Sequence, residues 1–131
     1  VLGPVGDYAD ELNDWSVGIR LTDGNHSFVM CGDAETEAEE DMARSGLNLS
    51  ADVLKSGHHG SRTSSSPEFL EAVSPSWAVI SCGKGNSYGH PHEETLKKYA
   101  EHRIQVLRTD EKGTIIASSS PEGLTWTYTK K

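Results

Sequence analysis

Residues 26–44 read HSFVMCGDAETEAEEDMAR, and this stretch decides the fold class. The apolar run from Phe28 to Cys31 predicts a short strand, which Gly32 and Asp33 end abruptly. Thr36 to Arg44 predicts a helix, because its first turns carry glutamates, which the helix dipole favours there, and a glycine follows its end. A strand that runs through a polar turn into a helix is the repeating unit of an α/β domain.

The same pattern continues on both sides of this stretch. Further strands are expected at residues 17–21, 52–55, 77–82, 105–108, 114–117 and 124–129. Further helices are expected at residues 67–73, with Ser65 and Glu68 as a capping box, and from Pro91 or Glu93 to about His102. The sequence therefore predicts an α/β fold, a mixed sheet with helices packed on it, in a single domain over residues 1–131.

Composition narrows the possible functions. The hydrophobic fraction of 34% and charged fraction of 24% fit a small, polar globular domain, and no apolar run reaches the ~20 residues of a membrane span. A net charge of −8 argues against a broad basic surface for nucleic acid. It does not exclude an enzyme that cuts phosphodiesters, because bound metal ions offset negative charge. The acidic run Asp33 to Asp41 is interpreted as a solvated helix face, and Cys31 and Cys82 as small buried hydrophobes.

Histidines and one aspartate fall in the loops that follow predicted strands. His58 and His59 lie between glycines, His90 and His92 flank Pro91, and Asp33 follows Gly32. Imidazole is the commonest metal ligand, and the loops beyond strand ends are where α/β sheets bind ligands. Each feature also has an ordinary interpretation: a turn or helix cap for Gly-Asp, a surface loop for His-His, and a lead into a helix for His-Pro-His.

Taken together, the segments are more specific than any one of them. In order and spacing they resemble the metallo-β-lactamase-fold domain of ComEC-type competence proteins, and the resemblance runs from about Leu2 to Ile116. The matching segments are residues 12–17 (LNDWSV), 28–35 (FVMCGDAE), 51–61 (ADVLKSGHHGS), 63–67 (TSSSP), 86–92 (NSYGHPH) and 108–110 (RTD).

This resemblance implies a fold, a chemistry and roles for residues. The fold would be half of an αββα sandwich whose complete site holds two divalent metals, usually zinc. Asp33 would bridge the metals, and one of His58 and His59 would be a ligand, with His59 favoured because it precedes Gly60. Asp33 and His90 would be catalytic, with His90 close to the substrate phosphate. The expected substrate-binding residues on the pocket rim are Asn13, Ser16, Ser61, Tyr88 and His92.

The implied activity is phosphodiester hydrolysis, a nuclease acting on DNA during uptake. Two metals about 3.5–4 Å apart can hold a hydroxide nucleophile and clamp both oxygens of an in-line displacement. The family also has an upstream His-x-His-x-Asp-His motif that supplies most ligands, and this motif is missing here. We therefore expect the C-terminal portion of the domain, with metal weakly held or absent and little activity in isolation.

The partners implied are DNA or another phosphodiester, the N-terminal half of the domain, and the membrane channel region of the parent protein. Direct membrane insertion of this chain is not expected. The family places the domain on the extracellular or periplasmic face of a bacterial membrane protein. Two alternatives stay open: a non-catalytic binding or assembly module of the same fold, and a hydrolase of another ester such as phosphocholine.

Overall fold

One mixed sheet of five strands forms the centre of the molecule in the computed structural model, which describes residues 1–130. Its strands lie in the order of the chain: β1 (Ile19–Asp23), β2 (His26–Met30), β3 (Val53–Lys55), β4 (Trp77–Ile80) and β5 (Gln105–Arg108). β1 pairs antiparallel with β2, and all later pairs are parallel. This confirms the predicted mixed sheet of an α/β fold.

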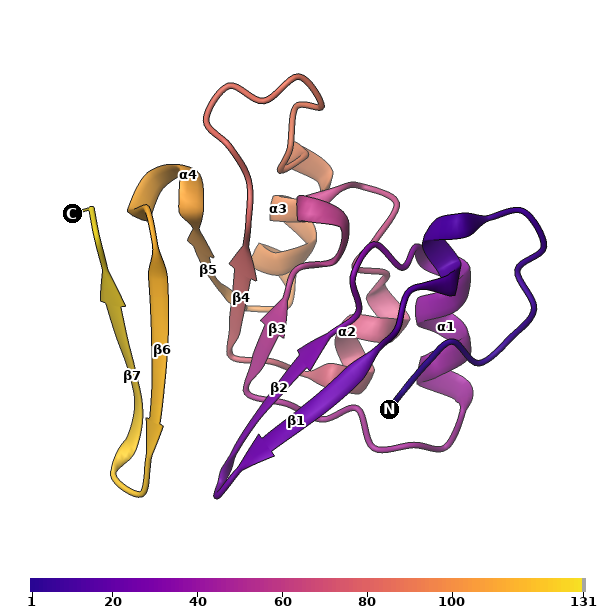
Figure 1. Ribbon diagram of the computed structural model, residues 1–131, viewed down its shortest axis with the longest axis horizontal. Coiled ribbons are helices and arrows are strands. Elements are labelled where there is room, and N and C mark those ends of the chain that lie inside the picture. The colour runs from indigo at the N-terminus through magenta and orange to yellow at the C-terminus, as the bar shows by residue number, and fades with distance from the viewer. Residues whose placement is uncertain (131) are drawn as a thin grey trace.

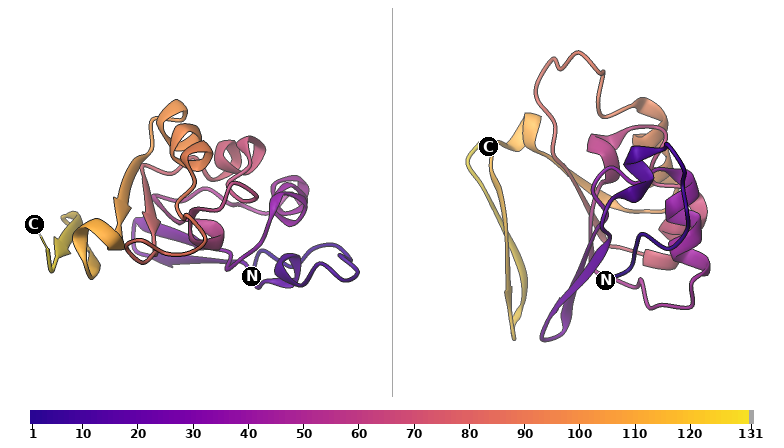
Figure 2. Two further views of the ribbon diagram at one scale, coloured as in Figure 1. Left: turned by 90° about the horizontal axis from the view of Figure 1, so that it is seen from above. Right: turned by 45° about the vertical axis from the view of Figure 1, so that its right-hand side comes forward.

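Three helices connect the parallel strands: α1 (Thr36–Arg44), α2 (Pro67–Val73) and α3 (Glu93–Glu101). Parallel strands need such crossovers, and crossovers of one hand between strands in sequential order place all helices on the same face. Figures 1 and 2 show α1, α2 and α3 together on one side of the sheet. The predicted bounds of α1 and α2 are confirmed to the residue.

The main core lies between the sheet and these helices. Alternation along β2 directs Val29, which is fully buried, into the core and leaves its neighbours Phe28 and Met30 half-buried. The largest apolar side chains in this core come from every layer: Met42, Leu54, Phe69, Leu70, Val73, Ile80 and Tyr99.

The opposite face of the sheet is covered by a C-terminal hairpin. Strands β6 (Ile115–Ser120) and β7 (Gly123–Tyr128) pair only with each other and form a second sheet within the described residues. Trp126 of β7 packs against Trp77 of β4, with ring centroids 5.2 Å apart. The hairpin therefore covers β4 and its neighbours while leaving a groove of about 160 Å³ that Phe28 and Met30 help to line.

Several local details differ from the sequence prediction. Short helical turns occur at η1 (Leu12–Trp15), η2 (Gly57–Gly60) and α4 (Thr109–Lys112), where irregular loops were expected. The N-cap of α2 is Ser66 rather than Ser65, because the Ser66 hydroxyl accepts the Phe69 N–H at 3.3 Å. Across residues 1–130, no helix is both long and apolar enough to span a bilayer.

Two predicted burial states are also wrong in part. Glu39 lies in the acidic run interpreted as a solvated face, but it is 1% exposed. Its carboxylate accepts the backbone N–H groups of Ser65 and Ser66 at 2.8 and 2.9 Å, which explains how a glutamate is tolerated there. Cys31 is buried as predicted, whereas Cys82 is half-buried in the loop that follows β4.

Candidate active site

The loops beyond the carboxyl ends of the parallel strands converge at one end of the sheet (Figure 1). Asp33 follows β2, the loop of residues 56–66 follows β3, and the loop of residues 81–92 follows β4. We call these the histidine loop (residues 56–66) and the tyrosine loop (residues 81–92). Parallel pairing of β2, β3 and β4 thus brings residues far apart in sequence to one edge, as the order of the segments predicts.

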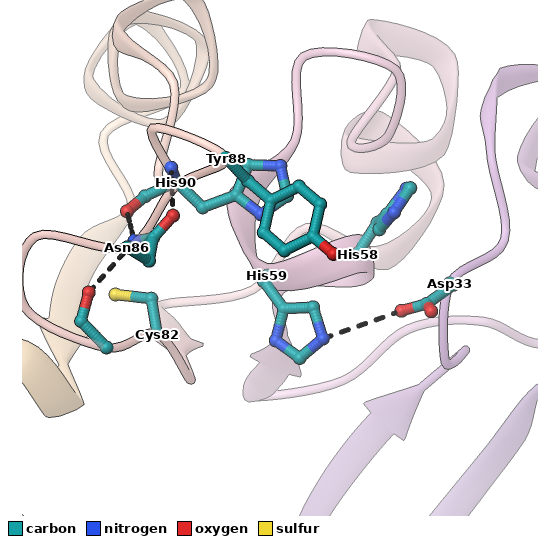
Figure 3. A pocket seen from close by; sticks show the side chains of 8 residues that line it. Asp33, His58, His59, Cys82, Asn86, Tyr88 and His90 are labelled. Atoms are coloured by element: carbon teal, nitrogen blue, oxygen red, sulfur yellow. Dashed lines mark hydrogen bonds and ion pairs between the residues drawn. The ribbon is translucent and has the colours of Figure 1, made fainter.

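Asp33 is held by its backbone, and its carboxylate is left accessible. Gly32 has a φ of +57°, a conformation that glycine adopts without strain, and this turn directs the chain out of β2. The Asp33 N–H then donates to Ser16 Oγ at 3.1 Å. The Asp33 side chain remains 46% exposed, and its Oδ1 lies 3.9 Å from His59 Nε2 (Figure 3).

The histidine loop contains three non-glycine residues with a positive φ, in the left-handed region of backbone space: His58, His59 and Ser65, whose φ is 59°. His58 has φ 48° and ψ 44°, and His59 has φ 56° and ψ 25°. Non-glycine residues in this region cost on the order of 1 kcal/mol or more and concentrate at functional sites. The turn that His58 and His59 form is tight enough that the Ser61 N–H donates back to the His58 carbonyl at 2.9 Å.

The hydrogen bonding of His59 fixes the roles of its ring nitrogens. Nδ1 lies 2.8 Å from the Ser81 carbonyl oxygen, which can only accept, so Nδ1 carries the proton. In the neutral ring the lone pair is therefore on Nε2, the atom that faces Asp33. A backbone carbonyl that orients one imidazole nitrogen while the other is left for a metal is the usual arrangement around histidine ligands.

His58 lines the same cleft as Asp33 and His59. Its Nδ1 is buried and has no hydrogen-bond partner among the described residues. Its ring meets that of His90 edge-on, with centroids 5.7 Å apart. A buried imidazole nitrogen without a hydrogen-bond partner is uncommon in folded proteins.

The serines of the histidine loop that make buried hydrogen bonds (Ser56, Ser64, Ser65 and Ser66) form what we call its inner side, and His58 and His59 form its outer side. The Tyr99 hydroxyl lies 2.6 Å from both Ser56 Oγ and Ser65 Oγ. Ser64 Oγ donates to the Ala34 carbonyl at 2.7 Å, and Glu39 receives two amides from the same loop. Burial raises the pKa of Glu39 to about 8, although the Ser66 and Ser65 amides and the Lys98 charge act against it.

The tyrosine loop is closed by the side chain of Asn86. Its Nδ2 donates to the His90 carbonyl at 2.6 Å, and its Oδ1 accepts the His90 N–H at 2.9 Å. Burial, followed by the nearby His92, His58 and His59 rings, lowers the pKa of His90, with Asp33 acting in the opposite sense. His90 is therefore neutral near pH 7 and available to donate or accept a hydrogen bond.

His92 joins the two loops. Its Nδ1 accepts the Arg62 N–H at 2.9 Å, and its Nε2 lies 3.1 Å from the Tyr88 carbonyl, which requires a proton on Nε2. Its backbone N–H also donates to the Gly60 carbonyl at 3.0 Å. Both ring nitrogens of His92 are thus used in hydrogen bonds that hold the histidine loop against the tyrosine loop.

These groups surround a cleft of about 340 Å³. Its walls are formed by Asp33, His58, His59, Cys82, Gly83, Asn86, Tyr88 and His90 (Figure 3). Of the residues predicted as metal-binding or catalytic, Asp33, His58, His59 and His90 all reach this cleft, and Tyr88 does so among the predicted substrate-binding residues. A small cleft with convergent polar groups is the form that ligand sites take.

The other predicted rim residues lie outside the cleft wall. Asn13 Nδ2 donates to Glu35 Oε1 at 2.9 Å, and Ser61 Oγ is buried against Thr63 Oγ1 at 3.0 Å. Ser16 contacts the backbone of Asp33, and His92 bridges the loops. In this structure these four residues support neighbouring groups.

The sequence prediction missed Cys82, Asn86 and the supporting pair Glu39 and Tyr99. Asn86 carries a usable signal, because an asparagine in a glycine-rich loop commonly bonds to nearby backbone. Glu39 and Tyr99 lie on helices at ordinary positions, so only their burial reveals their role.

Asp33 and His59 offer ligand atoms that could form part of the coordination shell of a metal ion. His59 Nε2 and the Asp33 carboxylate face one another across 3.9 Å, a separation that leaves room for a shared cation. Within residues 1–130, however, no three His, Cys, Asp or Glu side chains gather closely enough to hold a metal ion. Protein zinc sites take three or four ligands, so these residues do not form a complete site by themselves.

Comparison with known proteins gives relatives that are much longer. The chain is 42% identical over 115 residues to ComE operon protein 3 of Bacillus subtilis, covering 88% of this chain and 15% of that protein. It is 43% identical over 104 residues to Competence protein ComA of Neisseria gonorrhoeae, with 79% and 15% covered. It is 36% identical over 103 residues to Recombination protein 2 of Haemophilus influenzae, with 79% and 13% covered.

No protein-family model matches the chain. The chain spans about 15% of the length of its relatives ComE operon protein 3 and Competence protein ComA, so the similarity concerns one region of each. At identities of 36–43%, the chain is similar to one region of each of these three proteins, one of which is named a competence protein.

Proposed function

Starting from the similarity to these relatives, we propose that this chain is part of a metal-dependent phosphodiesterase, a nuclease acting in DNA uptake. The observation that carries the proposal is the approach of His59 Nε2 to the Asp33 carboxylate, with His59 Nδ1 held by the Ser81 carbonyl. Carboxylate and imidazole are the ligand types of hydrolytic zinc sites. In this proposal His90, which lines the same cleft and is neutral, would hydrogen-bond a phosphate oxygen.

The proposal includes the metallo-β-lactamase fold. In this account the chain is the C-terminal half of the αββα sandwich, and an N-terminal half supplies the missing ligands of two zinc ions. The small number of donors that meet in residues 1–130 supports this division. The domain would belong to a membrane protein with a channel region and would face the outside of the cell or the periplasm.

A role in competence is supported by names that the relatives carry, ComE operon protein 3 and Competence protein ComA. The chain matches only about 15% of the length of each relative. That it shares their role is therefore proposed here. The acidic net charge of −8 is compatible with DNA as a substrate at a site where cations bind.

Zinc titration of the chain tests the proposal. Asp33→Ala and His59→Ala should each weaken zinc binding by about 10-fold or more, because each removes one of few ligands. Asp23→Ala and His102→Ala are matched controls that remove the same chemical groups away from the cleft and should leave zinc affinity unchanged.

If the native chain and all four variants bind zinc with equal affinity, the metal site at Asp33 and His59 is rejected. The alternative would then be a non-catalytic binding or assembly module that uses the same fold. Hydrolysis of a model phosphodiester such as bis(4-nitrophenyl) phosphate adds a second readout, since the chain by itself should turn it over slowly or not at all. Rapid zinc-dependent turnover by this chain would contradict the division into two halves.

A further inference from the structure

Tyr88 is a large aromatic residue that is exposed although the loop backbone around it is hydrogen-bonded. Its side chain is among the most exposed apolar groups of the chain, at 76%. Its carbonyl accepts from His92 Nε2 at 3.1 Å, and the loop around it is closed by the two hydrogen bonds between Asn86 and His90. Exposing an aromatic ring costs solvation free energy, so a loop built to present one suggests that the ring meets a ligand.

The ring of Tyr88 starts a row of nearly parallel rings that leads into the cleft. Tyr88 stacks on His90 with centroids 5.5 Å apart and an interplanar angle of 16°. His90 in turn stacks on His59, at 6.2 Å and 15°. One face of Tyr88 is thus supported by His90, while the high exposure of the side chain leaves surface available for a further flat ring.

The same cleft connects Tyr88 with the candidate metal ligands. Tyr88, His90, His59 and Asp33 all line it, so a molecule held at Asp33 and His59 passes the tyrosine ring (Figure 3). If a metal ion at Asp33 and His59 binds a phosphodiester of a nucleic acid, as proposed above, the flat groups nearest to it, joined through the sugars, are nucleobases.

We propose that Tyr88 is a stacking platform for an unpaired nucleobase, and that the substrate enters the cleft as a single-stranded polynucleotide. This inference rests on the proposed function. Bases within a duplex already have both faces covered, whereas an unpaired base can stack on an aromatic side chain whatever its sequence.

The test measures binding of a fluorescein-labelled deoxythymidylate hexamer to the chain, first in EDTA, where no metal is bound, and then with Zn²⁺. Tyr88→Leu should weaken binding roughly 5- to 150-fold, the range that alanine substitutions of stacked aromatics give. Tyr88→Phe keeps the aromatic face and should stay close to the native affinity. Tyr128→Leu removes another partly exposed tyrosine, on β7, and should have no effect.

An abasic version of the hexamer separates stacking from other effects. Removing the bases should weaken binding to the native chain, but should change little for Tyr88→Leu, because the two changes remove the same interaction. A duplex long enough to stay paired at the assay temperature should bind more weakly than a single strand of the same length.

Equal binding by the native chain and Tyr88→Leu, equal binding of duplex and single strand, or no binding of the hexamer would each overturn the inference. These outcomes are distinct from failure of the proposed function. The effect of Tyr88→Leu is measured in EDTA, without bound metal, so its absence leaves the zinc result for Asp33 and His59 standing. Failure of the zinc result likewise leaves the effect of Tyr88→Leu in EDTA standing.

Discussion

The two sides of the histidine loop are built in opposite ways. On the inner side, Ser65 and Ser66 are buried and their backbone N–H groups donate to Glu39. The Tyr99 hydroxyl lies within hydrogen-bond distance of the Ser56 and Ser65 hydroxyls. On the outer side, His58 and His59 have left-handed backbones, and a buried nitrogen of His58 has no partner among residues 1–130. Ser65 on the inner side also has a positive φ of 59°, so backbone strain occurs on both sides and only the inner side has its polar groups satisfied. Those satisfied contacts can stabilise the strained residues, which is how functional geometry is commonly maintained.

The largest expected effect comes from removing the buried carboxylate. Glu39→Ala leaves the Ser65 and Ser66 amides buried without their acceptor, so we expect the free energy of unfolding to fall by about 2–5 kcal/mol. Urea denaturation measures this. Glu37→Ala, on the exposed side of α1, should change stability by less than about 0.5 kcal/mol. A Glu39→Ala protein as stable as the native chain would show that the inner side does not support the loop.

The same carboxylate predicts a pH dependence. The pKa of Glu39 is about 8 in the folded chain, above the ordinary value of 4.5, so the folded state holds a proton that the unfolded state has released. The contribution of Glu39 to stability is therefore fully present below about pH 4.5 and is lost as the pH rises towards 8. The slope from this group is at most about 1.4 kcal/mol per pH unit. Unfolding measured from pH 5 to 8 should show it in the native chain and not in Glu39→Ala.

Tyr99→Phe is a milder change to the inner side. It keeps the ring in the core but removes the hydroxyl that lies 2.6 Å from Ser56 Oγ and Ser65 Oγ. Two buried hydroxyls then lose a partner, and we expect a loss of about 1–3 kcal/mol in urea unfolding. Tyr128→Phe, on the hairpin, is the matched control. A loss no greater than in this control would mean that water or another group replaces the Tyr99 hydroxyl.

On the outer side the expected stability change is small and of opposite sign. His59→Gly relieves the left-handed backbone and removes a side chain that is 52% exposed. The glycine protein should be more stable than His59→Ala by about 1 kcal/mol, because alanine keeps the strain. Both should lose zinc binding. If alanine is as stable as glycine, the backbone at His59 is not strained.

The sequence predicted the fold in outline because hydrophobic periodicity, turn residues and caps act locally. The order of strands and helices, and the bounds of α1 and α2, depended on signals within a few residues. It missed η2 and the burial of Glu39, since left-handed histidines and a buried glutamate exist only where distant elements impose them. Strand ends with Gly, Asp and His predicted the cleft residues, whereas the supporting roles of Asn13 and His92 depend on contacts 22 and 30 residues away.

The central claim is that His59 offers Nε2, together with Asp33, to a metal ion. Long-range ¹H–¹⁵N spectra of the histidine rings during zinc titration test it most directly. The account predicts that zinc shifts the Nε2 resonance of His59 while Nδ1 keeps its proton, that His102 is unaffected, and that Asp33→Ala removes the shift at the same zinc concentration. A His59 ring that zinc leaves unchanged, or a shift that persists in Asp33→Ala, would contradict it.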